Sequence, residues 1–132
     1  MFLIHTLSAD GIQNLPDGKY LFAVGHSGRV RFASAEGRSG FASTHALLFP
    51  GETVLAAGHF TVAGSGEGGS SAEKRISAID MYSEHFFYAC HDKKFRKDVE
   101  KNSDRYFRRI GHFIKALRRF RVPFLGATVR KL

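Results

Sequence analysis

The chain has 132 residues with a single cysteine, and 43% of its residues are hydrophobic. This predicts one globular domain, residues 1–132, with a core of its own, and excludes both an intramolecular disulfide and a thiolate metal cluster. Residues 93–132 contain 14 Lys and Arg against 3 Asp and Glu, whereas the first 92 residues contain 6 against 9. Such a basic segment favours anionic partners: nucleic acid or a nucleotide, an acidic protein face, or an anionic membrane surface.

The first half of the chain has the pattern of short strands separated by turns. Runs rich in β-branched and aromatic residues predict strands over 2–7, 19–24, 29–33 and 53–62. Residues 25–28 form a turn signature between the second and third runs, and the apolar run 45–49 ends at a Pro-Gly pair. Gly58 lies inside the last run and is interpreted as the mark of a bulge or of a close backbone approach.

The middle of the chain continues this strand pattern after a glycine-rich stretch. Residues 63–72 contain four Gly and three Ser, and strand-like residues 76–79 follow. This stretch is interpreted as a loop inserted in a hairpin, and 85–89 as one further strand.

The last segment changes to a helical period. Apolar side chains recur there every three or four residues, at Tyr106, Phe107, Ile110, Phe113, Ile114, Leu117 and Phe120. This spacing predicts one long amphipathic helix within about 97–120, ended by Pro123, and a final strand within 126–132. The expected fold class is therefore α+β: a mostly antiparallel sheet, one long C-terminal helix and a last strand.

Six basic residues of this helix fall largely outside its apolar stripe and form the candidate binding surface. They are Arg105, Arg108, Arg109, Lys115, Arg118 and Arg119. Arginine and lysine beside aromatic rings suit phosphate contact with base stacking. A basic amphipathic helix equally suits a membrane surface or calmodulin, and the plainest alternative is the solvated face of a core-packing helix.

The sequence predicts neither a cleaved signal peptide nor a membrane span. Residues 1–7 are apolar but lack a basic leading segment, and no apolar run approaches the roughly 20 residues that a spanning helix needs. The protein is expected to be soluble, and its compartment stays open, including secretion by a route that needs no signal peptide.

Two of the seven histidines stand out as candidates for chemistry. No histidine spacing matches a zinc signature, so no metal and no cofactor are expected. His45 and His85 each lie at the start of an apolar run and near a hydroxyl residue, which for His85 is Ser83. Two positioned imidazoles can act as general base and general acid near neutral pH. The alternative is that both are hydrogen-bonded structural histidines.

The segments around these histidines resemble a known pair of motifs. Residues 45–58 (HALLFPGETVLAAG) resemble HSSFLAGG(x)xxxAAG, and residues 83–86 (SEHF) resemble SGHY. Both motifs are shared by plant IQ-motif-containing calmodulin-binding proteins and by fungal proteins and bacterial secreted or toxin-type modules. The resemblance covers about residues 19–88. It implies a shared module and a shared site rather than a defined reaction.

The chain departs from these motifs at several positions. Ala46 and Leu47 replace two serines, Glu84 replaces the glycine of SGHY and Phe86 replaces its tyrosine. The histidines and Ser83 are retained, whereas the lost hydroxyls weaken the case for intact catalysis.

The leading hypothesis is a small bacterial secreted effector or toxin-type module. It would use His45, Ser83 and His85 as a His-dependent enzyme on a phosphate-containing substrate, RNA or a nucleotide. One alternative is a non-catalytic binding module whose basic helix docks an acidic protein, nucleic acid or a membrane surface. Another is a nucleotide-cofactor-dependent transferase.

Overall fold

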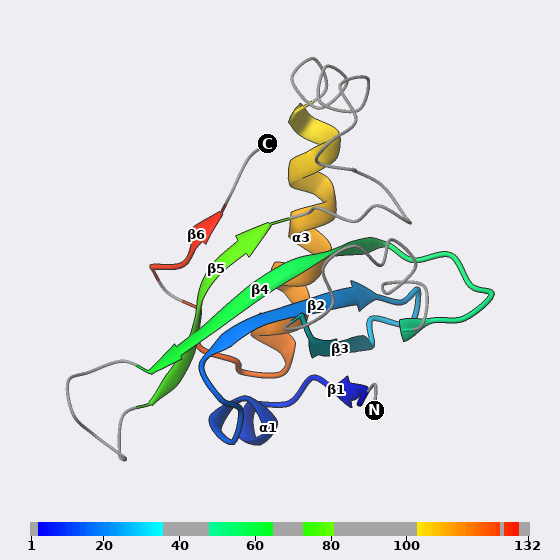
Figure 1. The fold of residues 1–132 in the computed structure, drawn as a ribbon. Helices are drawn as coiled ribbons and strands as arrows, with labels where there is room; N and C mark the ends of the chain where they lie inside the picture. Colours follow the sequence, from blue (N-terminus) through cyan, green and yellow to red (C-terminus); the bar gives the residue numbers. More distant parts are fainter. Residues whose placement is uncertain (1–2, 36–47, 65–72, 81–102, 125, 130–132) are drawn as a thin grey trace.

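The computed structural model describes residues 3–35, 48–64, 73–80, 103–124 and 126–129, with the side chains of the C-terminal helix described from residue 108 onward. Its strands form one sheet in the order β1-β3-β2-β4-β5-β6 (Figure 1). The strands are β1 His5–Thr6, β2 Gly18–Val24, β3 Val30–Ser34, β4 Ala56–Gly64, β5 Lys74–Asp80 and β6 Thr128–Val129. The helices in this part of the chain are α1 Ala9–Gln13 and α3 Ser103–Arg119.

The predicted fold class, a mostly antiparallel sheet with one long C-terminal helix, is wrong. The sheet is mixed, because β6 pairs parallel with β5. The described residues form two helices, and α3 has 17 residues rather than the full expected span of 97–120. The reason for the parallel pair is the connection: α3 lies in the crossover between β5 and β6, and parallel strands require such a crossover.

The predicted hairpin over 19–33 is confirmed. β2 and β3 pair antiparallel from Tyr20 opposite Ser34 to Val24 opposite Val30, and the turn between them lies at 25–28. β2 also pairs antiparallel with β4 along its whole length, from Gly18 opposite Val62 to Val24 opposite Ala56. β2 is therefore an interior strand of the sheet, which explains its continuous apolar run.

Two other strand predictions need correction. The N-terminal strand is reduced to β1, because Ser8 caps a short helix: its hydroxyl accepts a hydrogen bond of 3.0 Å from the Gly11 N–H. The strand predicted over 53–62 begins and ends later, as β4 Ala56–Gly64. Leu48 and Phe49 are buried in a turn that packs on the sheet. The expected strand over 85–89 lies outside the described residues. Of the loop predicted over 63–72, residues 63 and 64 belong to β4, and 65–72 lie outside the described residues.

An irregularity in the β4–β5 pair changes which residues of β5 face which side of the sheet. Val62 is opposite Ile76, but Thr61 is opposite Ala78, so the register shifts by one residue at Ser77. As a result both Ile76 and Ile79 belong to the core beneath α3, although residues three apart in a regular strand point to opposite faces. The irregularity lies at the Thr61–Val62 step and not at Gly58, which pairs in regular register with Phe22 of β2, and the close backbone approach named as the alternative for Gly58 stays a prediction.

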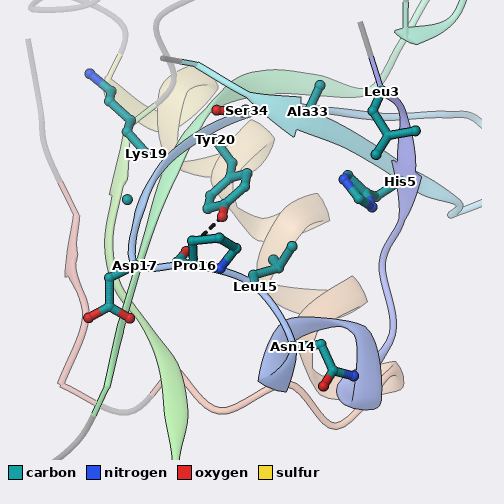
Figure 2. A pocket seen from close by; sticks show the side chains of 11 residues that line it. Leu3, His5, Asn14, Leu15, Pro16, Asp17, Lys19, Tyr20, Ala33 and Ser34 are labelled. Atoms are coloured by element: carbon teal, nitrogen blue, oxygen red, sulfur yellow. Dashed lines mark hydrogen bonds between the residues drawn. The ribbon is translucent and has the colours of Figure 1, made fainter. Parts of the chain in front are cut away.

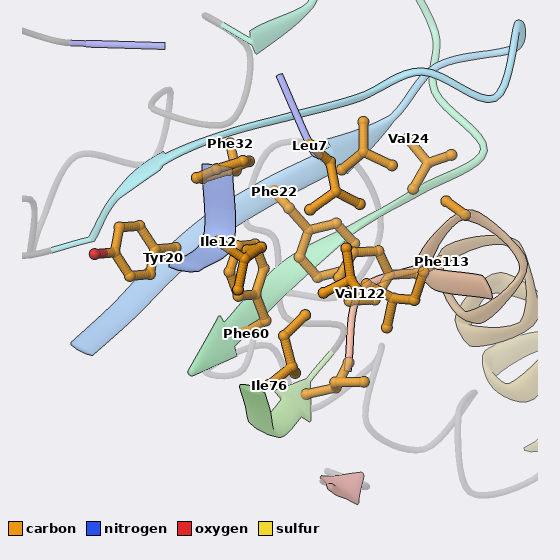
Figure 3. Close-up of a cluster of buried hydrophobic side chains, with 14 of the residues drawn as sticks. Leu7, Ile12, Tyr20, Phe22, Val24, Phe32, Phe60, Ile76, Phe113 and Val122 are labelled. Carbon is orange, nitrogen blue, oxygen red and sulfur yellow. The ribbon is translucent and has the colours of Figure 1, made fainter. Parts of the chain in front are cut away.

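Aromatic rings join α3 to the sheet in the main core (Figure 3). Phe113 of α3 is fully buried and stacks on Phe22 of β2 and Phe60 of β4, with ring centroids 3.9 and 5.8 Å apart. Tyr20 and Phe32 extend the cluster beyond Phe60. The helical stripe predicted from Ile110, Phe113 and Leu117 is confirmed, since all three are buried in this cluster.

The opposite face of the sheet has a smaller apolar cluster. Alternate residues of β2, β3 and β4 meet the turn at 48–54 there, and the members are Leu21, Ala23, Ala33, Leu48, Phe49, Val54 and Ala57. This cluster covers one end of the face. The remainder of that face has the polar residues described below.

Candidate functional site

The histidine site predicted from the motifs lies outside the part of the chain that the structure describes. His45, Ser83 and His85 all lie there, as does the whole segment 83–86 that resembles the SGHY motif. Their convergence remains a prediction.

The basic surface of α3 is described from Arg108 onward and is not uniform. Arg108, Lys115, Arg118 and Arg119 are exposed, as expected for a binding surface, whereas Arg109 is partly buried. The side chain of Arg105 lies outside the described residues. Of the six predicted residues, Lys115 and Arg119 line a hollow of the surface, together with His112 of the same helix.

That hollow lies where α3 faces the β2–β3 turn. It has a volume of about 300 Å³ and is called the turn groove below. His112, Lys115 and Arg119 line it from α3, and His26, Ser27 and Gly28 line it from the turn. Val24, Leu55 and Ala116 complete its lining with apolar groups. The three polar residues of α3 are spaced three and four apart, so they lie along one side of the helix.

The local backbone explains how the turn comes so close to the helix. The Gly28 N–H donates to the Gly25 carbonyl at 2.9 Å, and Gly28 has a φ of +85°, a conformation that other residues rarely adopt. A Cβ built on Gly28 would lie 3.1 Å from Nη1 of Arg119. The absence of a side chain at position 28 therefore leaves the space in which the Arg119 guanidinium lies.

His26 connects the turn groove to a second hollow. Its Nε2 lies 2.8 Å from the Thr53 hydroxyl oxygen, and it lines both the turn groove and a neighbouring hollow of about 400 Å³. Arg29 and Arg31 line the second hollow, together with Glu52. Arg31 is held in place, since it donates to the Leu48 carbonyl at 3.0 Å and its guanidinium carbon lies 4.5 Å from the centre of the Phe49 ring.

The charges around the turn groove have one sign. Lys115 and Arg119 are cationic, the two imidazoles of His26 and His112 can donate hydrogen bonds, and no Asp or Glu is among the described residues that line it. Donors of this kind around a concave surface suit the oxygen atoms of an anion, above all a phosphate group.

A polar pair on the other face of the sheet forms a second candidate. Nδ1 of His59 on β4 lies 3.0 Å from Oδ1 of Asp80 on β5, and both line a cavity of about 360 Å³. Lys19 of β2 lies on the same face, with its Nζ 3.9 Å from Oδ2 of Asp80.

A third cavity lies beside β1 and the start of β2 (Figure 2). It lacks a comparable group of polar side chains that point toward one another. Several of its polar side chains are engaged in local contacts: the Tyr20 hydroxyl donates to the Pro16 carbonyl at 2.7 Å, and Asp17 is paired with Lys74. The His5 ring is stacked on Phe32, with centroids 5.1 Å apart. We therefore assign this cavity no functional role.

The part of the chain that the structure describes has neither a metal-binding cluster nor a membrane-spanning helix. Among the described residues there is no group of three or more His, Cys, Asp or Glu side chains that could hold a metal ion. No helix in the same part of the chain is long and apolar enough to cross a membrane.

Comparisons of the chain with protein-family models, with curated proteins and with solved structures found no match. The resemblance to the IQ-motif-containing proteins therefore stays a prediction.

Sequence reasoning missed His26 and His112 as members of a site, although a signal for them was present. His112, Lys115 and Arg119 share one side of the expected helix, and His26 precedes the glycine of a predicted hairpin turn. The missing information was the contact between the turn and the helix, because no local pattern specifies which surface a hairpin turn approaches.

Proposed function

We propose that this protein binds phosphate groups of single-stranded nucleic acid through the turn groove. The observation that carries the proposal is the alignment of His112, Lys115 and Arg119 along one side of α3, facing the His26–Gly28 turn across a hollow of about 300 Å³. Two cations and two imidazoles can neutralise a phosphate and donate to its oxygen atoms. The exposed arginines nearby on α3 extend the positive surface along which a strand can lie.

The overall charge supports a polyanion rather than a single small anion. The chain has a formal net charge of +8, and the second hollow places Arg29 and Arg31 next to the turn groove through the shared His26. Phosphates along a strand can occupy both hollows in succession. Binding of this kind releases counterions, and its affinity falls with salt concentration.

The test compares two double variants that remove the same charge. Lys115→Gln/Arg119→Gln changes the turn groove, and Arg108→Gln/Arg118→Gln changes exposed cations of the same helix that do not line it. The probe is a fluorescent 2′-O-methyl oligoribonucleotide, whose binding is measured by anisotropy over a range of salt concentrations. Charge-assisted hydrogen bonds are worth roughly 1.5–3 kcal/mol each, so the groove variant should lose at least about 10-fold more affinity than the matched variant.

The salt dependence gives a second reading of the same experiment. Loss of two phosphate contacts should reduce the slope of log affinity against log salt by about 1.4 for a single strand. Equal losses in the two variants would mean that diffuse charge alone attracts the strand, and would contradict the proposal. Binding to an acidic peptide or to phosphatidylserine vesicles, without binding to the oligonucleotide, would contradict it as well.

The leading hypothesis of a secreted effector or toxin-type enzyme that uses His45, Ser83 and His85 also stands as a proposal. Its substrate class, a phosphate-containing molecule such as RNA or a nucleotide, agrees in charge with the turn groove. The nucleotide-cofactor-dependent transferase has no observation in its favour beyond that same charge.

A further inference from the structure

The carboxylate of Asp80 is buried within a sheet face that is otherwise open to a cavity. Asp80 has 4% of its surface exposed and is the one buried polar or charged residue among those that the structure describes. Burying a carboxylate is costly unless charged or hydrogen-bonding groups compensate it. Here His59 lies directly opposite on β4, and Lys19 lies nearby on β2.

The register shift at Ser77 is what brings this carboxylate to His59. In a regular continuation of the Val62–Ile76 register, His59 would face Ile79 and Asp80 would point into the other side of the sheet. With the extra residue, Asp80 is opposite His59 and shares its face. The irregularity thus builds the pair without displacing Ile76 or Ile79 from the core.

The His59–Asp80 pair determines which ring nitrogen of His59 carries the proton. An ionised carboxylate only accepts hydrogen bonds, so the 3.0 Å contact requires that Nδ1 of His59 carries the proton. In the neutral ring the lone pair then lies on Nε2, which makes His59 a proton acceptor of defined orientation. This is the arrangement in which a carboxylate positions a histidine base.

The surrounding cavity supplies room and a cation. The His59 side chain is 21% exposed, and the cavity beside it measures about 360 Å³. Its lining comes from four neighbouring strands and includes Lys19, Thr61 and Thr128. Lys19 is half exposed, so its ammonium group can reach a bound anion while remaining near Asp80.

We propose that His59, positioned by Asp80, is the general base of a ribonuclease site on this face, with Lys19 as its phosphate-contacting cation. The proposal takes its substrate class, an RNA strand, from the proposed nucleic-acid binding, and the catalytic groups differ from His45, Ser83 and His85. RNA contains both the attacking 2′-hydroxyl and the phosphodiester that it attacks. The groups that the protein supplies in this proposal are therefore one base and one cation.

The reaction is an internal transesterification. Nε2 of His59 takes the proton of a ribose 2′-hydroxyl, and the 2′-oxygen forms a bond to the adjacent phosphorus. The bond from phosphorus to the 5′-oxygen of the next nucleotide breaks, and that oxygen takes a proton from water. The hydroxide that remains takes up the proton held on Nε2 of His59, which restores the base. The products are a 2′,3′-cyclic phosphate and a free 5′-hydroxyl, and Lys19 stabilises the negative charge that develops on the phosphate oxygens.

The test uses a fluorescent oligoribonucleotide and the full chain. His59→Gln and Asp80→Asn should each lower the cleavage rate by roughly 10²–10⁴-fold, with products that end in a 2′,3′-cyclic phosphate. His5→Gln is the matched control, because His5 is a partly buried imidazole of the same sheet that is stacked on Phe32. It should keep the rate of the unaltered protein. Melting temperatures establish that each variant is folded.

A second readout separates positioning from a structural role of Asp80. The ring-nitrogen NMR shifts of His59 should show a protonated Nδ1 in the unaltered protein. In Asp80→Asn the amide group can donate to Nδ1, which moves the ring proton to Nε2 and removes the base. An altered rate with an unchanged tautomer would assign Asp80 a structural role and overturn this part of the proposal.

The 2′-O-methyl strand distinguishes the two proposals, because it binds but has no attacking hydroxyl. Binding of that strand without cleavage of RNA would overturn the ribonuclease site and leave the turn groove intact. Cleavage without measurable binding of that strand would overturn the turn groove and support the ribonuclease site. Cleavage by His59→Gln at the unaltered rate would mean a contaminating nuclease or another base, and would overturn the role of His59.

Discussion

At the scale of single residues, polar side chains of this protein are tied across long distances in the sequence. Asp17 accepts a hydrogen bond from Lys74 and also from the Gly64 N–H at 3.4 Å, and the backbone N–H and carbonyl of residue 74 bond the amide of Gln13. These contacts join the loop before β2 to β5 and the end of β4. They are exposed, and hence each should contribute little to stability.

The Asp17–Lys74 pair gives a pH-dependent prediction. The hydrogen bond from Lys74, and then that from the Gly64 N–H, lower the pKa of Asp17 below its ordinary value of 3.8. A lowered pKa means stabilisation that is present above the unfolded value and is lost as pH falls through the folded one. Asp17→Asn should therefore melt slightly below the unaltered protein at about pH 6, and the gap should close near pH 2.

Thermal melting of both proteins at the two pH values checks this expectation. Lys74→Gln should remove the same pH-dependent difference, because it removes the partner. A melting gap that is equal at both pH values would show that the pair does not act through the ionisation of Asp17.

At the scale of elements, α3 has a glycine in its interior without a structural reason for it. Gly111 is exposed, and a Cβ built on it meets nothing within 4 Å outside its own helix. Its backbone freedom in the unfolded chain opposes helix formation. The C-terminal end of α3, in contrast, has a regular cap. Arg121 has a φ of +57°, and the Val122 N–H donates to the Leu117 carbonyl at 2.9 Å. This is the hydrogen bond that commonly closes a helix, and Pro123 follows directly.

Gly111→Ala should stabilise the protein by about 1 kcal/mol, the difference in helix propensity between the two residues. Urea denaturation measures the change. Gly28→Ala is the opposite case, because its positive φ and the approach of Arg119 should make alanine destabilising by about 1–2 kcal/mol. A stabilisation by both, or by neither, would mean that backbone conformation does not decide these positions.

At the scale of the whole molecule, aromatic stacking joins α3 to the sheet. Phe113 is in contact with rings from both β2 and β4, so it couples the helix to two interior strands of the sheet. The same attachment holds the turn groove in shape, since His112, Lys115 and Arg119 are on the helix that Phe113 anchors. Packing at Phe113 therefore affects both stability and the geometry of the proposed binding site.

Phe113→Ala should cost about 3–5 kcal/mol of the free energy of unfolding, because it removes a fully buried ring and leaves a cavity. Phe120→Ala, at a partly buried position of the same core, should cost less. Urea denaturation followed by circular dichroism gives both values. Equal small losses would show that α3 packs on the sheet without depending on Phe113.

The sequence alone determined the features of this protein that are encoded within a few neighbouring residues. The β2–β3 hairpin follows from two apolar runs around a short turn, and the buried stripe of α3 follows from the spacing of Ile110, Phe113 and Leu117. The helix α1, which Ser8 caps, was not predicted, because the apolar N-terminus favoured a strand. Local periodicity predicts such elements because side-chain direction repeats with the backbone.

Only the tertiary structure decided how these elements meet. The parallel β5–β6 pair depends on the crossover through α3, and the turn groove depends on the approach of the β2–β3 turn to that helix. The His59–Asp80 pair depends on one extra residue at Ser77, which moves Asp80 to the other face of the sheet. Contacts between residues far apart in the sequence are selected by packing of the whole chain, and a shift of one residue reverses the face to which a strand side chain points.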